Sequence, residues 1–429
     1  MQQHLSPTRS VAAGLRSLPR TNKGFAATQA AWRFFANERI TLPLLAEPII
    51  VHAREASVSL SARYCLVMQD FSDLKFTTHE NKLDRIRLCN ESEYGYFLQS
   101  GLLVSDLDGS PLAPLYIGLE AADGVHSSRR ETPLPHRRQL DELNRTFGYI
   151  QGIGLAKACV HIFDRQADSV LHLRRFARCG RKFVIRSNDV RRVMFNGVSK
   201  LLKEVEESLQ SELKKVREIE HQGKKAWQYV AETRVSLNGA GRTKRPTAAE
   251  PNKRKLIKGK PLELRFVISQ VRDKKGKVLA TWRLWTNVEE EVKAEEIALW
   301  YYWRWRIESF FKLLKKGGQH LEQWQQESAE AVAKRLLVVA QACVIVWALA
   351  ASKEEKASEI RIFLVSLSGR LMKRGVEYTT PALLEGMWQF LAIIDALERY
   401  TTAELTEMAE EFLRLIGSKS DFKEVKELV

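Results

Sequence analysis

Short apolar runs of strand length alternate with helical segments between residues 64 and 186, and this alternation restricts the chain to few folds. The pattern predicts three strands, a helix, a strand, an Arg-rich helix and a last strand. The expected strands are 64–68, 96–105, 115–120, 159–163 and 183–186, with a turn at 106–109, a polar linker at 124–136 and a helix at 138–148. Strands interleaved with helices in this way favour a mixed α/β fold.

The remaining segments divide the chain further. Residues 1–60 predict a helical N-terminal region, with helices at 26–36 and after Thr41 and Pro43. Residues 61–187 form the first part of the α/β core, and 188–287 predict a β-rich insertion with strands at 227–235 and 264–271. The second part of the core is 288–350, with one long helix to about Lys316 and an apolar helix near 330–351, and 351–429 is a helical C-terminal region.

The charge of the chain points to a polyanionic partner. Lys and Arg number 68 against 52 Asp and Glu, a formal net charge of +16. Residues 242–277 alone hold 13 Lys or Arg against 3 acidic residues. Because this excess is concentrated in one stretch, nucleic acid is the first expected partner, and a solvated basic loop is the alternative.

Other function classes lack their motifs. The 5 cysteines are scattered without paired spacing, and the 9 histidines show no zinc-hydrolase spacing. No Walker motif implies ATP. The N-terminus has no apolar signal segment, and the apolar run 336–351 is shorter than a membrane span and contains Gln341. We therefore expect a cytoplasmic protein without a membrane partner and interpret that run as a buried helix.

Two aspartates follow apolar runs. Asp70 and Asp164 come directly after predicted strands, where open α/β sheets place ligand-binding side chains. A single Asp at such a position is more often a turn residue or a helix cap than a ligand. Two of them together make a shared site a stronger hypothesis.

The segment 301–315 carries the most specific pattern. On a continuous helix, Tyr301, Arg304, Glu308, Lys312 and Lys315 fall within an arc of roughly 80°. Ile307, Phe310, Phe311 and Leu314 fall on another face. From composition alone, a solvated Glu/Lys face that merely supports the helix is the more common explanation.

A resemblance to a known family favours a functional explanation. Tyr301, Arg304, Glu308 and Lys315 give Tyr-x2-Arg-x3-Glu-x6-Lys, inside Tyr-x-x-Arg-Trp-Arg-Ile-Glu-x-Phe-x-Lys. This resembles the signature of the insertion-sequence-4 family of DDE transposases. The family's contexts for its two aspartates are similar to Gln69-Asp70-Phe71-Ser72 and to Asp164-Arg165-Gln166-Ala167-Asp168. The resemblance runs in order from about residue 26 to 324.

The resemblance implies a ribonuclease-H-like catalytic core, a β-rich insertion before the helix that bears the third carboxylate, a helical N-terminal DNA-binding region and a helical C-terminal dimerisation region. It implies that Asp70, Asp164 and Glu308 are the catalytic, metal-binding triad. Three carboxylates suit two Mg²⁺ or Mn²⁺ ions per active site, because hard cations prefer oxygen ligands.

Further residues are implied to bind DNA. Tyr301, Arg304, Lys312 and Lys315 would hold a phosphate beside the triad, and Arg186 matches another basic residue of the family. Trp282 resembles a tryptophan that stacks on a flipped base, although Trp285 competes for this role and a core tryptophan is equally expected. Lys253, Arg254 and Lys255 in the basic stretch would follow the DNA backbone.

The sequence therefore predicts a cut-and-paste transposase that binds the terminal inverted repeats of a transposon. By the resemblance, a nicked end would release a 3′-hydroxyl that forms a DNA hairpin, and the element would then be inserted into target DNA. The expected assembly is a homodimer on double-stranded DNA, associated with the bacterial nucleoid. The alternatives are a catalytically silent or domesticated relative that inhibits by binding DNA, a shortened inhibitory isoform, and an RNA-binding scaffold. The segment 381–397 resembles the family's dimer-forming helix, and ordinary helical core is its alternative.

Overall fold

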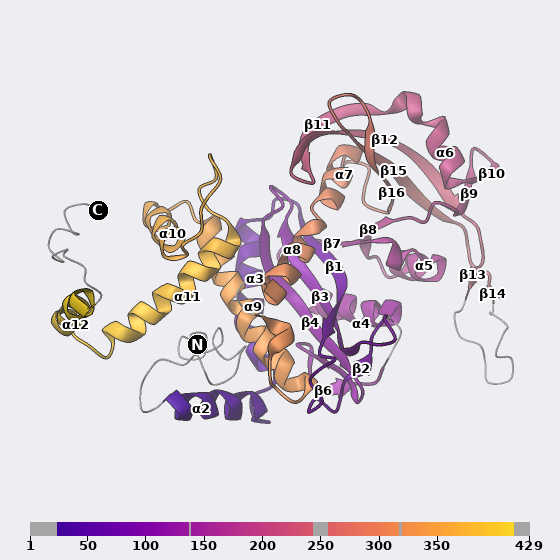
Figure 1. Cartoon of the computed structure of the whole chain (residues 1–429). Helices are drawn as coiled ribbons and strands as arrows, with labels where there is room; N and C mark the ends of the chain where they lie inside the picture. Colours follow the sequence, from indigo (N-terminus) through magenta and orange to yellow (C-terminus); the bar gives the residue numbers. More distant parts are fainter. Residues whose placement is uncertain (1–23, 137–138, 243–255, 317–319, 416–429) are drawn as a thin grey trace.

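The computed structural model of the chain describes residues 24–136, 139–242, 256–316 and 320–415. It is a mixed α/β structure in which one 14-stranded sheet runs through most of the molecule (Figure 1). Its strands follow the order β10-β9-β12-β15-β16-β8-β7-β1-β3-β4-β5-β6, with β11 beside β12 and β2 beside β3. The mixed α/β class expected from the sequence is confirmed.

The centre of the sheet contains the strands predicted first. β1 (Tyr64–Lys75) pairs antiparallel with β3 (Tyr94–Ser105), which pairs antiparallel with β4 (Pro111–Ala121). On its other side, β1 pairs parallel with β7 (Ala158–Phe163), and β7 pairs parallel with β8 (Lys182–Arg186). Short strands complete this region: β2 (Ile86–Arg87), β5 (Gly124–Ser127) and β6 (Arg130–Leu134).

The segment predicted as a β-rich insertion extends the same sheet. Its antiparallel strands are β9 (Arg192–Phe195), β10 (Val198–Leu201), β11 (Lys214–His221), β12 (Lys224–Leu237), β15 (Leu262–Arg272) and β16 (Val278–Thr286), with the helix α6 (Leu202–Ser208). The short strands β13 (Gly241–Arg242) and β14 (Leu256–Ile257) pair separately. Because β16 pairs with β8, the inserted strands are hydrogen-bonded directly to the central strands.

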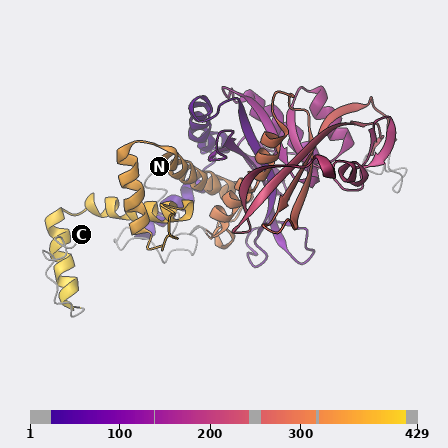
Figure 2. The ribbon, with the colours of Figure 1, turned by 90° about the horizontal axis from the view of Figure 1, so that it is seen from above.

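Helices surround the sheet and form the C-terminal part. They are α2 (Gly24–Ala36), α3 (Leu42–Ser59), α4 (Gln139–Gly152), α5 (Val170–Arg178), α7 (Ala294–Tyr302), α8 (Trp305–Lys316), α9 (Ala329–Ala351), α10 (Glu355–Leu367), α11 (Thr380–Leu397) and α12 (Thr402–Leu415). Thr41 caps α3 by accepting a hydrogen bond from the N–H of Leu44, as a helix after Thr41 requires. Figure 2 shows α11 and α12 extending away from the sheet.

At β8, two hydrophobic cores lie on opposite faces of the sheet. Val184 belongs to the larger core, whereas its neighbours Phe183 and Ile185 belong to the smaller one. The larger core also contains Ile307 and Leu314 of α8. The period-2 alternation of strand side chains explains this division, because successive residues point to opposite faces of a sheet. The helix with the predicted third carboxylate thus covers one defined face.

Three local predictions are wrong. β1 continues past Asp70 to Lys75, because pairing with β3 satisfies the polar residues that follow the apolar run. The expected linker 124–136 contains β5 and β6, which extend the sheet beyond β4. The expected long helix up to Lys316 is interrupted between α7 and α8.

α9 is 23 residues long and apolar enough to cross a membrane by length and composition. It is longer than the run 336–351 considered in the sequence. Most of its most apolar window is buried inside the protein, because the helix packs against α3 and β4. The prediction of a buried helix is confirmed.

Candidate active site

Asp70 and Asp164 lie side by side on the two central parallel strands. In the β1–β7 ladder, Met68 is level with Ile162, so two further residues bring Asp70 level with Asp164. Phe71 packs against the smaller core, which turns its neighbour Asp70 toward the face covered by α8. Asp164 follows β7 and caps the short 3₁₀ turn Arg165–Ala167 by accepting from the N–H of Arg165 at 2.7 Å.

Glu308 reaches the same place from the first turn of α8. The link is Arg304, whose Nη1 donates to Asp70 Oδ2 at 3.0 Å and whose Nη2 donates to Glu308 Oε1 at 2.9 Å. Arg304 is only 4% exposed. A buried guanidinium therefore joins two carboxylates that are 238 positions apart in the chain.

The interruption between α7 and α8 makes this contact geometrically feasible. Arg304 N–H bonds to the carbonyl of Tyr301 at 3.1 Å, and Ile307 N–H bonds to that of Arg304 at 3.2 Å. These i to i−3 bonds tighten the chain where the sequence predicted a regular helix. Trp303 packs its indole against the turn at Gly109, whose φ is +73°. A side chain at Gly109 would overlap that indole.

Tyr301 and Arg186 contact Asp164. The Tyr301 hydroxyl donates to Asp164 Oδ1 at 3.2 Å, and Arg186 Nη1 lies 3.5 Å from the same oxygen. Trp282, on β16, is 5% exposed and packs on Tyr301 with ring centroids 5.5 Å apart. Trp285 lies in the smaller core beside Phe266. Of the two candidate tryptophans, Trp282 is the one that contacts a side chain bound to Asp164.

The electrostatics of these groups are coupled. Burial raises the pKa of the Asp70 carboxyl; Arg304 opposes this, while Glu308 and Asp164 add to it. Burial would also raise the pKa of Asp164, but the N–H of Arg165 and the charges of Arg304 and Arg186 outweigh it and lower that pKa. Burial opposes the charge of Arg304, but the surrounding Tyr301 and carboxylates raise its pKa, so it stays cationic.

A cavity of about 380 Å³ opens beside these carboxylates and is lined by Asp70, Phe71, Ser72, Glu308, Phe311, Lys312 and Lys315. Lys312 is exposed, whereas Lys315 is half-buried and its Nζ donates to the carbonyl of Asp73. The cavity is thus lined by both carboxylates and ammonium groups. Lys253, Arg254 and Lys255 lie outside the described residues.

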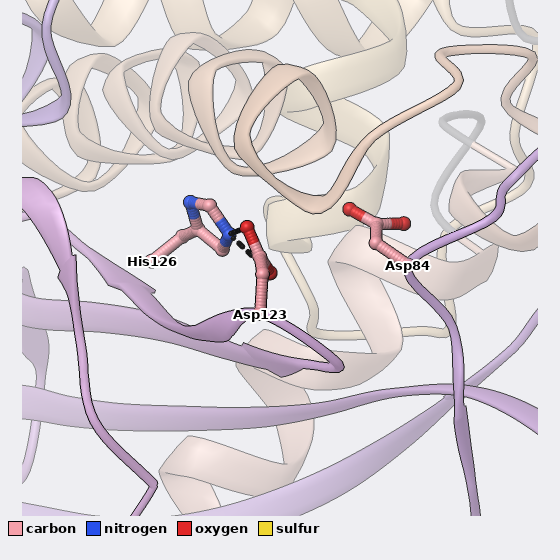
Figure 3. A group of neighbouring side chains, drawn as sticks. All are labelled: Asp84, Asp123 and His126. Carbon is pink, nitrogen blue, oxygen red and sulfur yellow. Dashed lines mark hydrogen bonds and ion pairs between the residues drawn. The ribbon is translucent and has the colours of Figure 1, made fainter.

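A second group of possible metal ligands lies elsewhere. Asp84, Asp123 and His126 form the one group of three such side chains in the described segments whose ligand atoms all lie within 4.8 Å of one another (Figure 3). The predicted triad is more open, since Arg304 lies between two of its members. The sequence pattern does not predict this group, because only His126 lies in the expected linker and the fold alone brings Asp84 and Asp123 close to it.

The bonds of this second group are those of a structural contact. Asp84 accepts from the Tyr96 hydroxyl at 2.5 Å and from the N–H of Ala329, at the start of α9, at 2.6 Å. His126 Nε2 lies 2.9 Å from Asp123 Oδ1. Asp84 therefore holds the first turn of the apolar helix α9 against the sheet.

Comparison with known proteins finds a family match in the central part of the chain. No curated protein matches it. Residues 135–347 match the family of the transposase DDE domain, a range that includes Asp164 and Glu308 but begins after Asp70. The arrangement around Arg304 adds Asp70 to the two carboxylates inside that range. The central part of the chain is therefore similar to a transposase DDE domain.

Proposed function

We propose that the chain is a cut-and-paste DNA transposase of the insertion-sequence-4 family, which includes the transposon-five enzyme. The observation that carries this proposal is the meeting of Asp70, Asp164 and Glu308 around Arg304 and Tyr301. The transposase DDE domain supports a transposase. The signature residues from Tyr301 to Lys315 support the particular family.

The strand order supports a ribonuclease-H-like core. β4, β3 and β1 are successive antiparallel neighbours, and β7 and β8 continue the sheet parallel to β1. The first carboxylate is on the central strand, the second follows its parallel neighbour, and the third is on a later helix. In the proposed domain plan, the insertion between β8 and α7 is the 188–287 segment.

The side chains present fit a pair of divalent metal ions. Asp70, Asp164 and Glu308 would hold them, and carboxylate oxygens are the donors that Mg²⁺ and Mn²⁺ prefer. The place between Asp70 and Glu308 already accommodates a cation, the Arg304 guanidinium. Two bound ions supply Lewis-acid activation for phosphoryl transfer. With the carboxylates holding ions, the guanidinium of Arg304 would be available to bind a DNA phosphate.

The surrounding groups are suited to hold DNA. Lys312 and Lys315 place positive charge at the cavity, and Arg186 adds a guanidinium beside Asp164. Burial, followed by the Asp164 charge, raises the pKa of Tyr301, so its phenol stays a hydrogen-bond donor. Trp282 would accept a flipped base during hairpin formation only after moving from its packed position on Tyr301. The proposed assembly is a homodimer on two transposon ends, acting at the nucleoid.

Cleavage of DNA carrying the terminal repeats, with Mg²⁺, tests the proposal. We expect Asp70→Asn and Glu308→Gln to lower the cleavage rate more than about 100-fold while retaining DNA binding. Asp123→Asn is the matched control, because this exposed carboxylate belongs to the other acidic group. Equal loss in the control would contradict the assignment. Tight binding by the wild-type chain without any nicking would instead identify a silent, inhibitory relative.

A further inference from the structure

A second cavity, of about 440 Å³, lies along α8 next to the candidate active site. Among its lining residues are Arg306, Phe310, Lys312, Trp347, Arg370 and Pro381. Its size is within the range of pockets that hold small organic groups. It brings together α8, α9, the segment after α10 and the start of α11.

The charges around this second cavity are all of one sign. Arg306, Lys312 and Arg370 are exposed, and none of them forms an ion pair with an acidic side chain within the described ranges. No Asp or Glu lines the cavity. The N-terminus of α11 also reaches it through Thr380 and Pro381, and a helix N-terminus favours an anion. These positive charges therefore favour a negatively charged ligand.

The floor of the second cavity is formed by apolar side chains that are themselves largely buried, since Phe310, Leu313 and Trp347 are 1%, 6% and 5% exposed. Phe310 and Trp347 meet edge to face, with ring centroids 5.7 Å apart, and Leu313 lies beside them. Pro111 and Pro381 add further apolar surface. An inorganic anion would use the cations but would leave the apolar part of the cavity, between Pro111 and Pro381, without a ligand group. A ligand with both a phosphate and a flat apolar ring satisfies both parts, and a nucleotide has this composition.

The second cavity is also next to the candidate active site, with Lys312 between them. Lys312 lines both cavities, with Glu308 and Lys315 on one side and Arg306 and Phe310 on the other. A DNA strand bound along the carboxylates therefore passes the second cavity within one or two turns of the same helix.

We propose that this second cavity binds one unpaired nucleotide of DNA, with its phosphate on Arg306, Lys312 and Arg370 and its base in the apolar part of the cavity, between Pro111 and Pro381 and above the buried floor. The inference rests on the proposed function, because it takes the occupant to be the strand held at the carboxylates. It assigns to the chain a preference for DNA ends that carry unpaired nucleotides.

Equilibrium binding without metal tests this proposal. The full chain is titrated into fluorescent 20-base-pair duplexes, either blunt or with a three-thymidine overhang of 5′ or 3′ polarity, and anisotropy is recorded. We expect at least one overhang to bind about fivefold or more tighter than the blunt duplex, the lower range for one stacked base.

Two variants separate the charges from the cavity. Arg370→Gln removes one cation, and Thr380→Phe fills the mouth while keeping all three cations; both should abolish the overhang preference. Arg374→Gln is the matched control, because this exposed arginine does not line the cavity, and it should keep the preference. Melting temperatures establish that each variant is folded.

The outcomes distinguish this inference from the proposed function. Equal binding of blunt and overhang DNA by the wild-type chain, or a preference that survives both Arg370→Gln and Thr380→Phe, overturns the inference alone. An absence of binding to every duplex overturns the proposed function as well.

Discussion

Arg304 is the residue on which the arrangement of the candidate active site depends. Replacing it with Ala would leave the carboxylates of Asp70 and Glu308 close together without a cation. We expect Arg304→Ala to lower the free energy of unfolding without metal by about 3 kcal/mol, because one partner of a buried ion pair is removed. Urea unfolding measures this loss.

Addition of Mg²⁺ provides the second part of this prediction. The melting temperature of Arg304→Ala should rise more with Mg²⁺ than that of the wild-type chain, since the ions no longer displace a guanidinium. Arg306→Ala, an exposed arginine two residues away, is the control and should respond like the wild type. Equal Mg²⁺ responses of all three chains would contradict the proposed competition.

His161 predicts a pH dependence of stability. It is stacked on Phe147 with ring centroids 3.9 Å apart, and burial, with a smaller contribution from Arg181, lowers its pKa from 6.5 to about 3. Below pH 6.5 the unfolded chain therefore takes up a proton that the folded chain does not. This contribution to stability is present above pH 6.5 and is lost as the pH falls toward 3.

We expect this effect to lower the free energy of unfolding by about 1.4 kcal/mol when the pH falls from 7.5 to 5.5. His161→Phe keeps the ring stacking but has no group that takes up this proton. Its free energy of unfolding should therefore fall by about 1.4 kcal/mol less than that of the wild type over the same interval, as measured by urea unfolding at both pH values. Parallel losses in the two proteins would show that His161 is not the source.

At the scale of single residues, much of the candidate site could be predicted from the sequence. Asp70, Asp164, Glu308, Tyr301 and Arg304 were all expected, and the structure brings them together. The Arg304 bridge could not be predicted, because it depends on the distance between β1 and α8. The inward packing of Trp282 on Tyr301 likewise depends on a sheet register that local patterns do not contain.

Among the elements, α10 and α11 cross at Gly386. A Cβ at this position would lie 1.8 Å from the carbonyl oxygen of Leu364 in α10. Gly386→Ala should therefore destabilise the protein by about 2 kcal/mol, although Gly to Ala within an unobstructed helix is normally stabilising. Gly152→Ala, at the end of α4 where a Cβ meets nothing within 4 Å, is the control. Urea unfolding compares the two, and equal stabilities would refute the proposed crossing.

Most elements could be predicted because apolar periodicity is local. The strands β7 and β8 and the helix α9 were expected close to where they occur. The extension of β1 could not be predicted, since its last residues are held by pairing with β3 rather than by their own apolar character. The interruption at Trp303 also depends on a distant partner, the turn at Gly109.

For the whole molecule, the C-terminal helices raise the question of assembly. The first half of α11 is buried up to Trp388, but Ile393 and Leu397 are 39% and 51% exposed. If this half contacts a second chain, Ile393→Asp with Leu397→Asp should leave the melting temperature unchanged and abolish the dimer on DNA. Light scattering of the DNA complex measures its mass. Ile362→Asp, an exposed position on α10, is the control, and a dimeric double variant would contradict the prediction.

The pairing of β16 with β8 connects the insertion to the centre of the molecule without a hinge. Leu284 is level with Arg186, and the next strand along from β8, β7, ends at Phe163, directly before Asp164. Figure 1 shows the inserted strands continuing the sheet outward from these positions. A DNA duplex held by the outer part of the insertion would thus lie at a fixed distance from the carboxylates, because hydrogen-bonded strands join the two regions. The position at which the DNA is cleaved would then depend on the geometry of the paired strands rather than on the length of a flexible linker.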